Sequence, residues 1–309
     1  EAFRLAEWKA LIENISKDCI LVCGGGIVEL EASRVLLKNH YPVVYVKSSL
    51  DNIKQNLQES DSKHRTPIDL ESVYKSRKNR FEEVCDYLFY YEDRDLEKTS
   101  KAFSVFLKRA KGEKSPLPND WSYFGCLTSD NLEPLDSQLS GIELRLDKLS
   151  KGYKLLTKLR QNYSELLTIA TFRQESGFSE NYWKVLRDLL KWAPDFIDVE
   201  FQPTENWILN WFELAKNLGG TRVILSYHGT EDLETKHYLM ESLKPDIIKF
   251  ISPYFRNKLY RKGTRELTFS MGKRSQVTRV QNSYFNPVAL EQAVAPGQLT
   301  LSELSSLQV

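Results

Sequence analysis

Residues 221–251 read TRVILSYHGTEDLETKHYLMESLKPDIIKFI, and this stretch predicts how the larger part of the chain folds. Two short apolar runs, 221–227 and 246–251, flank a segment with a helical pattern. Runs of this length that are rich in Ile and Val are typical of strands buried on both faces of a parallel sheet. His228 follows the first run and Lys249 lies within the second, so two reactive side chains are expected on neighbouring strands.

A lysine inside an apolar strand places a charge where charge is costly. Burial favours the neutral amine, which is a nucleophile toward carbonyl groups. His228 can supply the proton transfers that such chemistry needs. The alternative is that Lys249 forms a salt bridge and that His228 ends its strand without a chemical role. Taken alone, these two residues favour the structural alternative.

The stretch belongs to a longer alternation of strands and helices. Strand-like runs occur at 122–128, 141–147, 166–173, 196–201, 221–227, 246–251, 266–271 and, more weakly, 284–288. Eight strands interleaved with helices predict an α/β fold of the (β/α)₈ barrel type, whose sites lie at the C-terminal ends of the strands. The polar residues on or at the ends of these runs are Glu143, Arg145, Arg173, His228 and Lys249. Their convergence favours a functional site over separate structural roles.

The first third of the chain predicts a smaller parallel α/β sheet. CILVCGGGIVEL (19–30) indicates a buried strand that runs into three glycines, and 42–48 indicates a second apolar strand. SPLPND (115–120) has the composition of a linker. We therefore expect an α/β domain with an exit helix over 1–114 and the barrel over 121–309.

Composition excludes several classes of partner and cofactor. Among the 309 residues, 43 Lys and Arg balance 42 Asp and Glu, so no global basic field attracts nucleic acid or an anionic membrane. Cys19 and Cys23 lie close together, but no second close pair completes a zinc site, and we expect no metal. No apolar run has the length of a membrane span and no signal peptide opens the chain, which favours an intracellular protein.

Six motifs in the second part of the chain occur in the order known for one enzyme family. They are GIELRLDKL (141–149), ATFR (170–173), SYH (226–228), DIIKFI (246–251), SMGKRSQVTRVQN (270–282) and VAPGQLTLSEL (294–304). Together they resemble the motifs of type I 3-dehydroquinate dehydratase over residues 121–309.

This resemblance implies a role for each matching residue. Lys249 would form an imine with the ketone of 3-dehydroquinate, and His228 would remove the neighbouring proton and help to expel water. Arg279 would hold the substrate carboxylate, since a guanidinium offers a bidentate fork. The other implied contacts are Gln298 beside that carboxylate and Glu143, Arg145 and Arg173 at the ring hydroxyls. The family needs no metal or cofactor.

Structural alternatives remain for the implied binding residues. Arg173 could simply pair with Glu175, and Gln298 could be a residue of a loop-to-helix turn. Glu143, Arg145 and Asp147 could form a salt bridge of the barrel.

The first part of the chain resembles the C-terminal half of shikimate kinase. The matching segments are LVCGGGIVE (21–29), HRTP (64–67) and RKNRF (77–81). The resemblance implies a kinase-like substrate site made of Gly24, Gly25, Gly26, Arg65 and Arg77. The chain contains no G-x-x-x-x-G-K-[ST] phosphate loop, so we expect it not to bind ATP.

The order of the two segments is that of the fungal AROM polypeptides and of the fungal quinate repressors, which are regulatory relatives of AROM. Two departures separate the chain from the dehydratase pattern. Gly229 and Thr230 follow the histidine, where the family usually has a pair such as Asp-Phe. The connections after Arg173 and Ile251 are short, and such connections shape and close a pocket.

The departures favour a regulatory pseudoenzyme. Such a protein would sense a small-molecule metabolite of the quinate and shikimate pathways and repress quinate utilisation. The resemblance implies that it acts on a transcription activator protein in the nucleus and/or cytoplasm, without direct binding to nucleic acid or membrane. The alternative is an active type I 3-dehydroquinate dehydratase region of an AROM-like polypeptide, which the retained Lys249, His228 and Arg279 favour.

Overall fold

The computed structural model divides into two compact units, Glu1–Thr99 and Ser100–Val309, and each is described by itself. The described residues are 2–59, 69–92, 95–118, 122–174, 180–201, 206–230, 232–252, 265–270, 272, 276–281, 285–290, 293–295 and 297–307. The division falls inside helix α5 (Leu96–Ala110), before the expected end of the first domain at residue 114. The expected domain limits remain a prediction.

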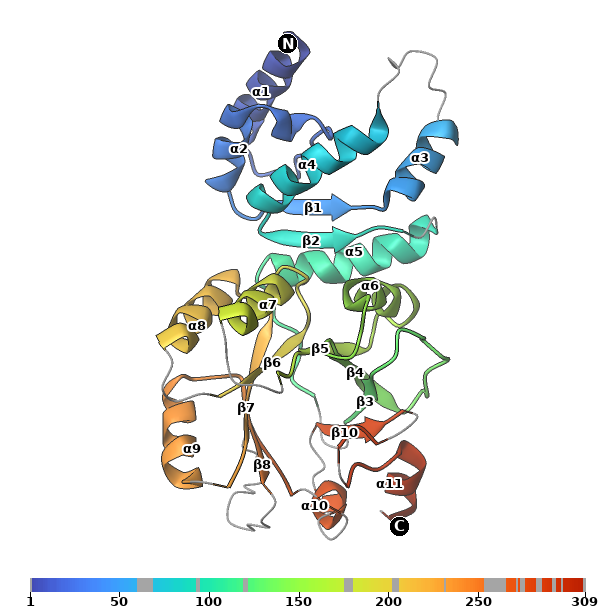
Figure 1. Ribbon diagram of the computed structural model, residues 1–309, viewed down its shortest axis with the longest axis vertical. Helices are drawn as coiled ribbons and strands as arrows, with labels where there is room; N and C mark the ends of the chain where they lie inside the picture. Colours follow the sequence, from blue (N-terminus) through green and yellow to red (C-terminus); the bar gives the residue numbers. More distant parts are fainter. Residues whose placement is uncertain are drawn as a thin grey trace. The chain divides into compact units, whose positions relative to one another are not determined.

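The first unit is a small α/β layer. Its elements are α1 (Ala2–Asn14), η1 (Ile27–Glu29), α2 (Glu31–Lys38), β1 (Val44–Lys47), α3 (Leu50–Glu59), α4 (Leu70–Val84) and β2 (Tyr87–Tyr90). Strands β1 and β2 pair in parallel, with Val44 opposite Tyr87. Helices α1, α2 and α4 gather on one side of this sheet (Figure 1), where Leu11, Val28 and Leu37 form a buried apolar core.

The expected strand before the triple glycine is wrong. Residues 20–24 have no regular structure, and Ile20 and Val22 are 76% and 88% exposed. A strand needs a neighbour that satisfies its N–H and C=O groups. Within the described part of this unit the sheet consists of β1 and β2 alone. The apolar run therefore has the composition of a strand without the pairing that would make it one.

The second unit contains eight parallel strands. They are β3 (Tyr123–Leu127), β4 (Leu139–Arg145), β5 (Leu167–Thr171), β6 (Phe196–Glu200), β7 (Arg222–His228), β8 (Ile247–Ser252), β9 (Glu266–Ser270) and β10 (Asn286–Ala289). The helices are α6 (Gly152–Asn162), α7 (Glu180–Leu190), α8 (Asn206–Leu218), α9 (Leu233–Ser242), α10 (Gln276–Gln281) and α11 (Leu301–Leu307). Strands pair in the order β10-β3-β4-β5-β6-β7-β8-β9, so the last strand lies beside the first.

This sheet curls around an apolar interior. Side chains from strands throughout the series meet in one buried cluster, which contains Phe124, Ile169, Phe196, Ile224, Ile247, Leu267 and Phe285. The Phe285 ring stacks on Phe124 at 4.0 Å between centroids and meets Phe196 edge to face at 5.4 Å. Helices α6 to α9 lie outside the strands (Figure 1). The prediction of eight parallel strands with helices between most of them is confirmed, although the described residues between β3 and β4 form no helix.

Helix α5 is joined to the strand series by a buried ion pair. Arg109 Nε donates to Asp195 Oδ1 at 2.7 Å. The other oxygen of Asp195 accepts hydrogen bonds from Thr168 N at 2.9 Å and Thr168 Oγ1 at 2.7 Å. These contacts lie at the N-terminal ends of β5 and β6, away from the expected site. They agree with the assignment of most of α5, from Ser100 onward, to the second unit.

Candidate functional site

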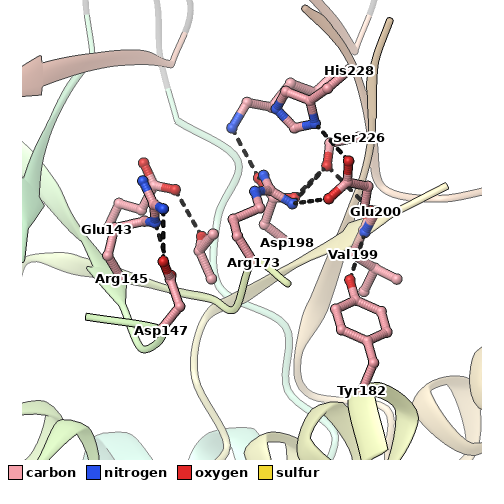
Figure 2. Close-up of polar contacts among 12 residues, drawn as sticks. Glu143, Arg145, Asp147, Arg173, Tyr182, Asp198, Val199, Glu200, Ser226 and His228 are labelled. Carbon is pink, nitrogen blue, oxygen red and sulfur yellow. Dashed lines mark hydrogen bonds and ion pairs between the residues drawn. The ribbon is translucent and has the colours of Figure 1, made fainter. Parts of the chain in front are cut away.

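Two carboxylates of β6 lie at the centre of the site. Asp198 and Glu200 are two residues apart, so the alternation of a strand directs both to the same side. Figure 2 shows them facing Arg173, which follows β5, and Ser226 and His228 near the end of β7. The C-terminal ends of three neighbouring strands therefore supply one polar network.

Asp198 is fully buried and holds two cations. Lys249 Nζ donates to Asp198 Oδ2 at 2.9 Å, and Arg173 Nη2 lies 2.9 Å from the same oxygen. Ser226 Oγ donates to Asp198 Oδ1 at 2.6 Å. Burial raises the pKa of Asp198, but the two cations and these hydrogen bonds outweigh it and hold the pKa well below its usual range.

His228 lies beside the second carboxylate of β6. Its Nδ1 atom is 3.3 Å from Glu200 Oε1, but it makes no hydrogen bond with acceptable geometry in the described part of the chain. Burial lowers the pKa of His228, Glu200 opposes this effect, and the charges of Arg173 and Lys249 lower the pKa further. The environment therefore favours the neutral imidazole, which can accept a proton.

The backbone of Glu200 is held by a hydrogen bond to helix α7. Its backbone N–H donates to Tyr182 Oη of α7 at 3.0 Å. Burial raises the pKa of its carboxyl group, while the contact with His228 and the charge of Arg173 lower it, and the net pKa lies below the ordinary value. The carboxylate is thus available to orient His228.

Arg279 of α10 is a buried cation of a different kind. It is 3% exposed, and its Nε and Nη1 atoms have no hydrogen-bond partner among the described residues. Its guanidinium lies over the Phe269 ring, with Cζ 5.0 Å from the centroid. Burial lowers its pKa and the charge of Glu143 opposes that shift. Glu143 itself accepts a hydrogen bond from Thr171 Oγ1 at 2.8 Å.

Comparison with known protein families identifies the part of the chain that carries this polar network. A sequence model of type I 3-dehydroquinase matches residues 128–308, which is more than half of the chain. The chain belongs to the type I 3-dehydroquinase family. A model of shikimate kinase matches residues 1–109.

The curated relatives are much longer proteins. The pentafunctional AROM polypeptide of Komagataella phaffii is 29% identical over an alignment 346 positions long, which covers 96% of this chain and 22% of the relative. That of Saccharomyces cerevisiae is 25% identical over an alignment 360 positions long, which covers 99% of this chain and 22% of the relative. The chain therefore spans about a fifth of the length of these relatives.

Solved structures of the family show the same kind of similarity. The dehydroquinate dehydratase and shikimate dehydrogenase part of S. pombe AroM is 22% identical, with a TM-score of 0.47, over 62% of this chain and 44% of that one. A type I 3-dehydroquinate dehydratase from Clostridium difficile, with covalently modified comenic acid, is 19% identical with a TM-score of 0.49. That match covers 63% and 96% of the two chains.

Two of the expected binding residues of the type I 3-dehydroquinase domain are occupied by contacts of their own. Arg145 donates to both oxygens of Asp147, from Nε at 3.0 Å and from Nη2 at 2.8 Å. Gln298 Oε1 accepts a hydrogen bond from Val294 N–H at 2.8 Å. Both contacts agree with the structural alternatives given above, in which Arg145 forms a salt bridge and Gln298 belongs to a turn. That either residue contacts a ligand remains a prediction.

The other expected residues of the dehydroquinase site lie close to one another. Lys249 and Arg173 share Asp198, and His228 is coupled to both of these cations through their charges. Arg173 pairs with the acids of β6, while Glu175, its expected alternative partner, lies outside the described residues. The catalytic roles of Lys249 and His228 remain predictions.

Sequence reasoning missed the acidic half of the dehydroquinase site. Asp198, Glu200 and Ser226 were not expected as site residues, although they make most of its contacts. The signal was present in FIDVEF (196–201), where two acids alternate within an apolar strand. A lysine buried in DIIKFI needs such a counter-charge, because an unpaired buried charge is strongly unfavourable.

The kinase-like site is only partly described. Arg77 Nε donates to Glu29 Oε1 at 2.8 Å, and Arg4 Nε donates to Glu29 Oε2 at 2.7 Å. A Cβ atom added at Gly25 would lie 3.6 Å from Arg77 Nη1. The structure thus brings Arg77 to the triple glycine, Gly24 to Gly26, while Arg65 lies outside the described residues.

Proposed function

We propose that the chain is a regulatory pseudoenzyme whose barrel binds a carboxylate metabolite of the quinate and shikimate pathways. The observation that carries the proposal is a contrast between two buried cations. Lys249 is engaged by Asp198 at 2.9 Å, whereas Arg279 has two guanidinium nitrogens without a partner in the described part of the chain.

An unpartnered buried guanidinium supports ligand binding. Leaving such a group without a partner is unfavourable in the empty site, and a carboxylate ligand would relieve it with charge-assisted hydrogen bonds. The engaged lysine supports binding without turnover. The carboxylate of Asp198 holds the amine at hydrogen-bond distance, and this contact must open before the nitrogen can attack a carbonyl group. Binding is thus better supported than chemistry.

The regulatory part of the proposal follows from the resemblance to quinate repressors. Occupancy of the barrel would be signalled to a transcription activator protein in the nucleus and/or cytoplasm. The near-neutral charge of the chain supports a protein partner over direct contact with nucleic acid. Among the described residues, no helix is both long and apolar enough to cross a membrane.

An active 3-dehydroquinate dehydratase is the second candidate. The register of β7 and β8 pairs Ser226 with Lys249 and His228 with Ile251, so His228 lies on the same face as the lysine and nearer the strand end. A neutral imidazole at that position could remove the proton next to an imine carbon, as the family mechanism requires. This candidate requires the ion pair between Lys249 and Asp198 to open when substrate binds.

One experiment separates the two candidates. The protein is incubated with 3-dehydroquinate and borohydride, the adduct on Lys249 is sought by mass spectrometry, and turnover is assayed in parallel. We expect binding of quinate or 3-dehydroquinate by calorimetry without turnover. Turnover that disappears in Lys249→Ala would overturn the pseudoenzyme proposal. Absence of binding by quinate, 3-dehydroquinate and dehydroshikimate would overturn both candidates.

A further inference from the structure

Asp198 lies between the reactive lysine and an arginine. The resemblance to the dehydratase family assigned it no role. Its Oδ2 atom is 2.9 Å from both Lys249 Nζ and Arg173 Nη2, and its side chain is 1% exposed. Solvent screens a pair buried to this degree only weakly, so the carboxylate acts on Nζ at close range. Ser226 Oγ at 2.6 Å fixes its other oxygen.

We propose that Asp198 is a positioning residue that serves as the fixed counter-charge of Lys249 Nζ, first as an ammonium and then as a protonated imine. Asp198 acts through the lysine and needs no contact with a ligand. The imine part of the proposal rests on the second candidate function, in which Lys249 forms an imine with a ketone, whereas the ammonium part concerns the protein alone.

The charge on Nζ is conserved when an imine forms. An ammonium and a ketone give a protonated imine and one water molecule. The C=O bond breaks, a C=N bond forms, two of the three ammonium protons leave with the oxygen as water, and the third stays on nitrogen. One counter-charge therefore serves both states. Asp198 is suited to this role because its pKa lies well below the usual range, so it stays ionised.

Other charged and titratable groups also face this pair. Arg173 and Glu200 lie next to Asp198 from the β5 and β6 sides, and His228 lies on β7. Cys126 of β3 lies within electrostatic range of Lys249, but burial raises the pKa of its thiol, so it stays neutral. Among these groups Asp198 alone has a contact with Nζ recorded at hydrogen-bond distance.

The test measures the protonation of Lys249 without relying on the proposed ligand. Formaldehyde and cyanoborohydride methylate neutral amines, and peptide mass spectrometry reports the rate at Lys249 across pH in the full chain. In Asp198→Asn, loss of the negative charge should move the pH midpoint of this rate about one to three units toward acid. At a pH below both midpoints, the rate at Lys249 should rise about tenfold or more.

Glu200→Gln is the matched control, because it removes the same charge two residues away on the same strand. It should move the midpoint at Lys249 much less than Asp198→Asn does. Should Asp198→Asn fail to fold, Arg173→Gln tests the same pair from the other side. Loss of the cation that shares Asp198 should move the midpoint toward alkaline pH. An unchanged midpoint in Asp198→Asn, or in Arg173→Gln when it replaces that variant, or an equal shift in Glu200→Gln, would overturn the proposal.

The imine part has its own readout. With 3-dehydroquinate in place of formaldehyde, Asp198→Asn should lower the yield of reduced adduct at high pH, where the amine is neutral in both proteins. The reason is that the protonated imine loses its counter-charge. An unchanged yield would contradict this part. Absence of any adduct in the unmodified protein, together with a shifted formaldehyde profile, would contradict imine formation at this site and leave the ammonium role of Asp198 standing.

Discussion

The arginines of the site differ in whether the protein itself supplies hydrogen-bond partners for their guanidinium groups. Asp147 accepts two hydrogen bonds from one edge of the Arg145 guanidinium, while Arg279 is more deeply buried and leaves Nε and Nη1 without a partner in the described residues. A buried polar group without a partner loses its hydration without replacement. Arg279 thus costs the fold stability, and a ligand carboxylate is the group that would compensate for it.

Replacement of Arg279 should separate stability from binding. We expect Arg279→Met to raise the free energy of unfolding by about 1–2 kcal/mol, since an unsatisfied buried group disappears. The same variant should lose about tenfold or more in affinity for quinate, because a charge-assisted hydrogen bond contributes about 1.5–3 kcal/mol. Urea denaturation and calorimetry measure the two effects.

The control for this prediction is Arg145→Met, which removes a guanidinium that is already paired. This variant should lower the free energy of unfolding, because Asp147 would be left without its partner. A loss of stability in Arg279→Met as large as that in Arg145→Met would contradict the interpretation of Arg279 as a ligand-binding group.

Contacts outside the site position the strands that carry its residues. Strand β6 begins after Asp195, which ties α5 to β5 and β6 at their N-terminal ends, and it ends at Glu200 in the site. Strand β7 ends against Gly229, whose N–H donates to Ile251 O at 3.1 Å. A Cβ atom at Gly229 would lie 2.5 Å from the Tyr227 hydroxyl. The glycine that departs from the family pattern therefore fits the local packing.

The ion pair at the end of α5 should matter for the stability of the second unit. We expect Arg109→Ala to lower the free energy of unfolding by about 3–5 kcal/mol, because it leaves the buried Asp195 without its cation. Lys108→Ala, at the exposed neighbouring position, should change it by less than about 0.5 kcal/mol. Chemical denaturation followed by tryptophan fluorescence measures both, and equal effects would contradict the role of the ion pair.

The whole molecule responds to pH through its buried titratable groups. The pKa of His228 is below its ordinary value of 6.5 in the folded state, so the unfolded chain binds more protons just below that pH. The stability that comes from keeping His228 neutral in the fold is therefore complete when the pH is above the ordinary pKa of histidine, and it is lost as the pH falls below that pKa. Asp198 and Glu200 have lowered pKa values as well, and their contribution is lost only at more acidic pH.

A comparison at two pH values isolates the histidine. Between pH 7.5 and pH 5.5 we expect the free energy of unfolding of the protein to decrease, because protonation of His228 is disfavoured in the fold. His228→Gln should show a smaller decrease over the same interval, since glutamine does not titrate. Urea denaturation at both pH values measures the difference. A decrease of the same size in both proteins would show that other groups dominate.

The sequence by itself determined the alternation of strands and helices, because both depend on local periodicity. It also placed Glu143, Arg173, His228 and Lys249 on or at the ends of strands, since a motif carries its own position along a strand. Local pattern failed at residues 20–24, where an apolar run has the composition of a strand and no strand pairs with it in the described part of the first unit.

Only the tertiary structure decided which charges meet. Asp198 lies 51 residues from Lys249 in sequence, and nothing in either strand alone indicates that they form an ion pair. Their contact depends on the register of β6, β7 and β8, in which Asp198 pairs with Ile224 and Ser226 with Lys249. A shift of one residue would turn each side chain to the other face. The lysine that the motif identified therefore has an acidic partner that only the packed sheet brings to it.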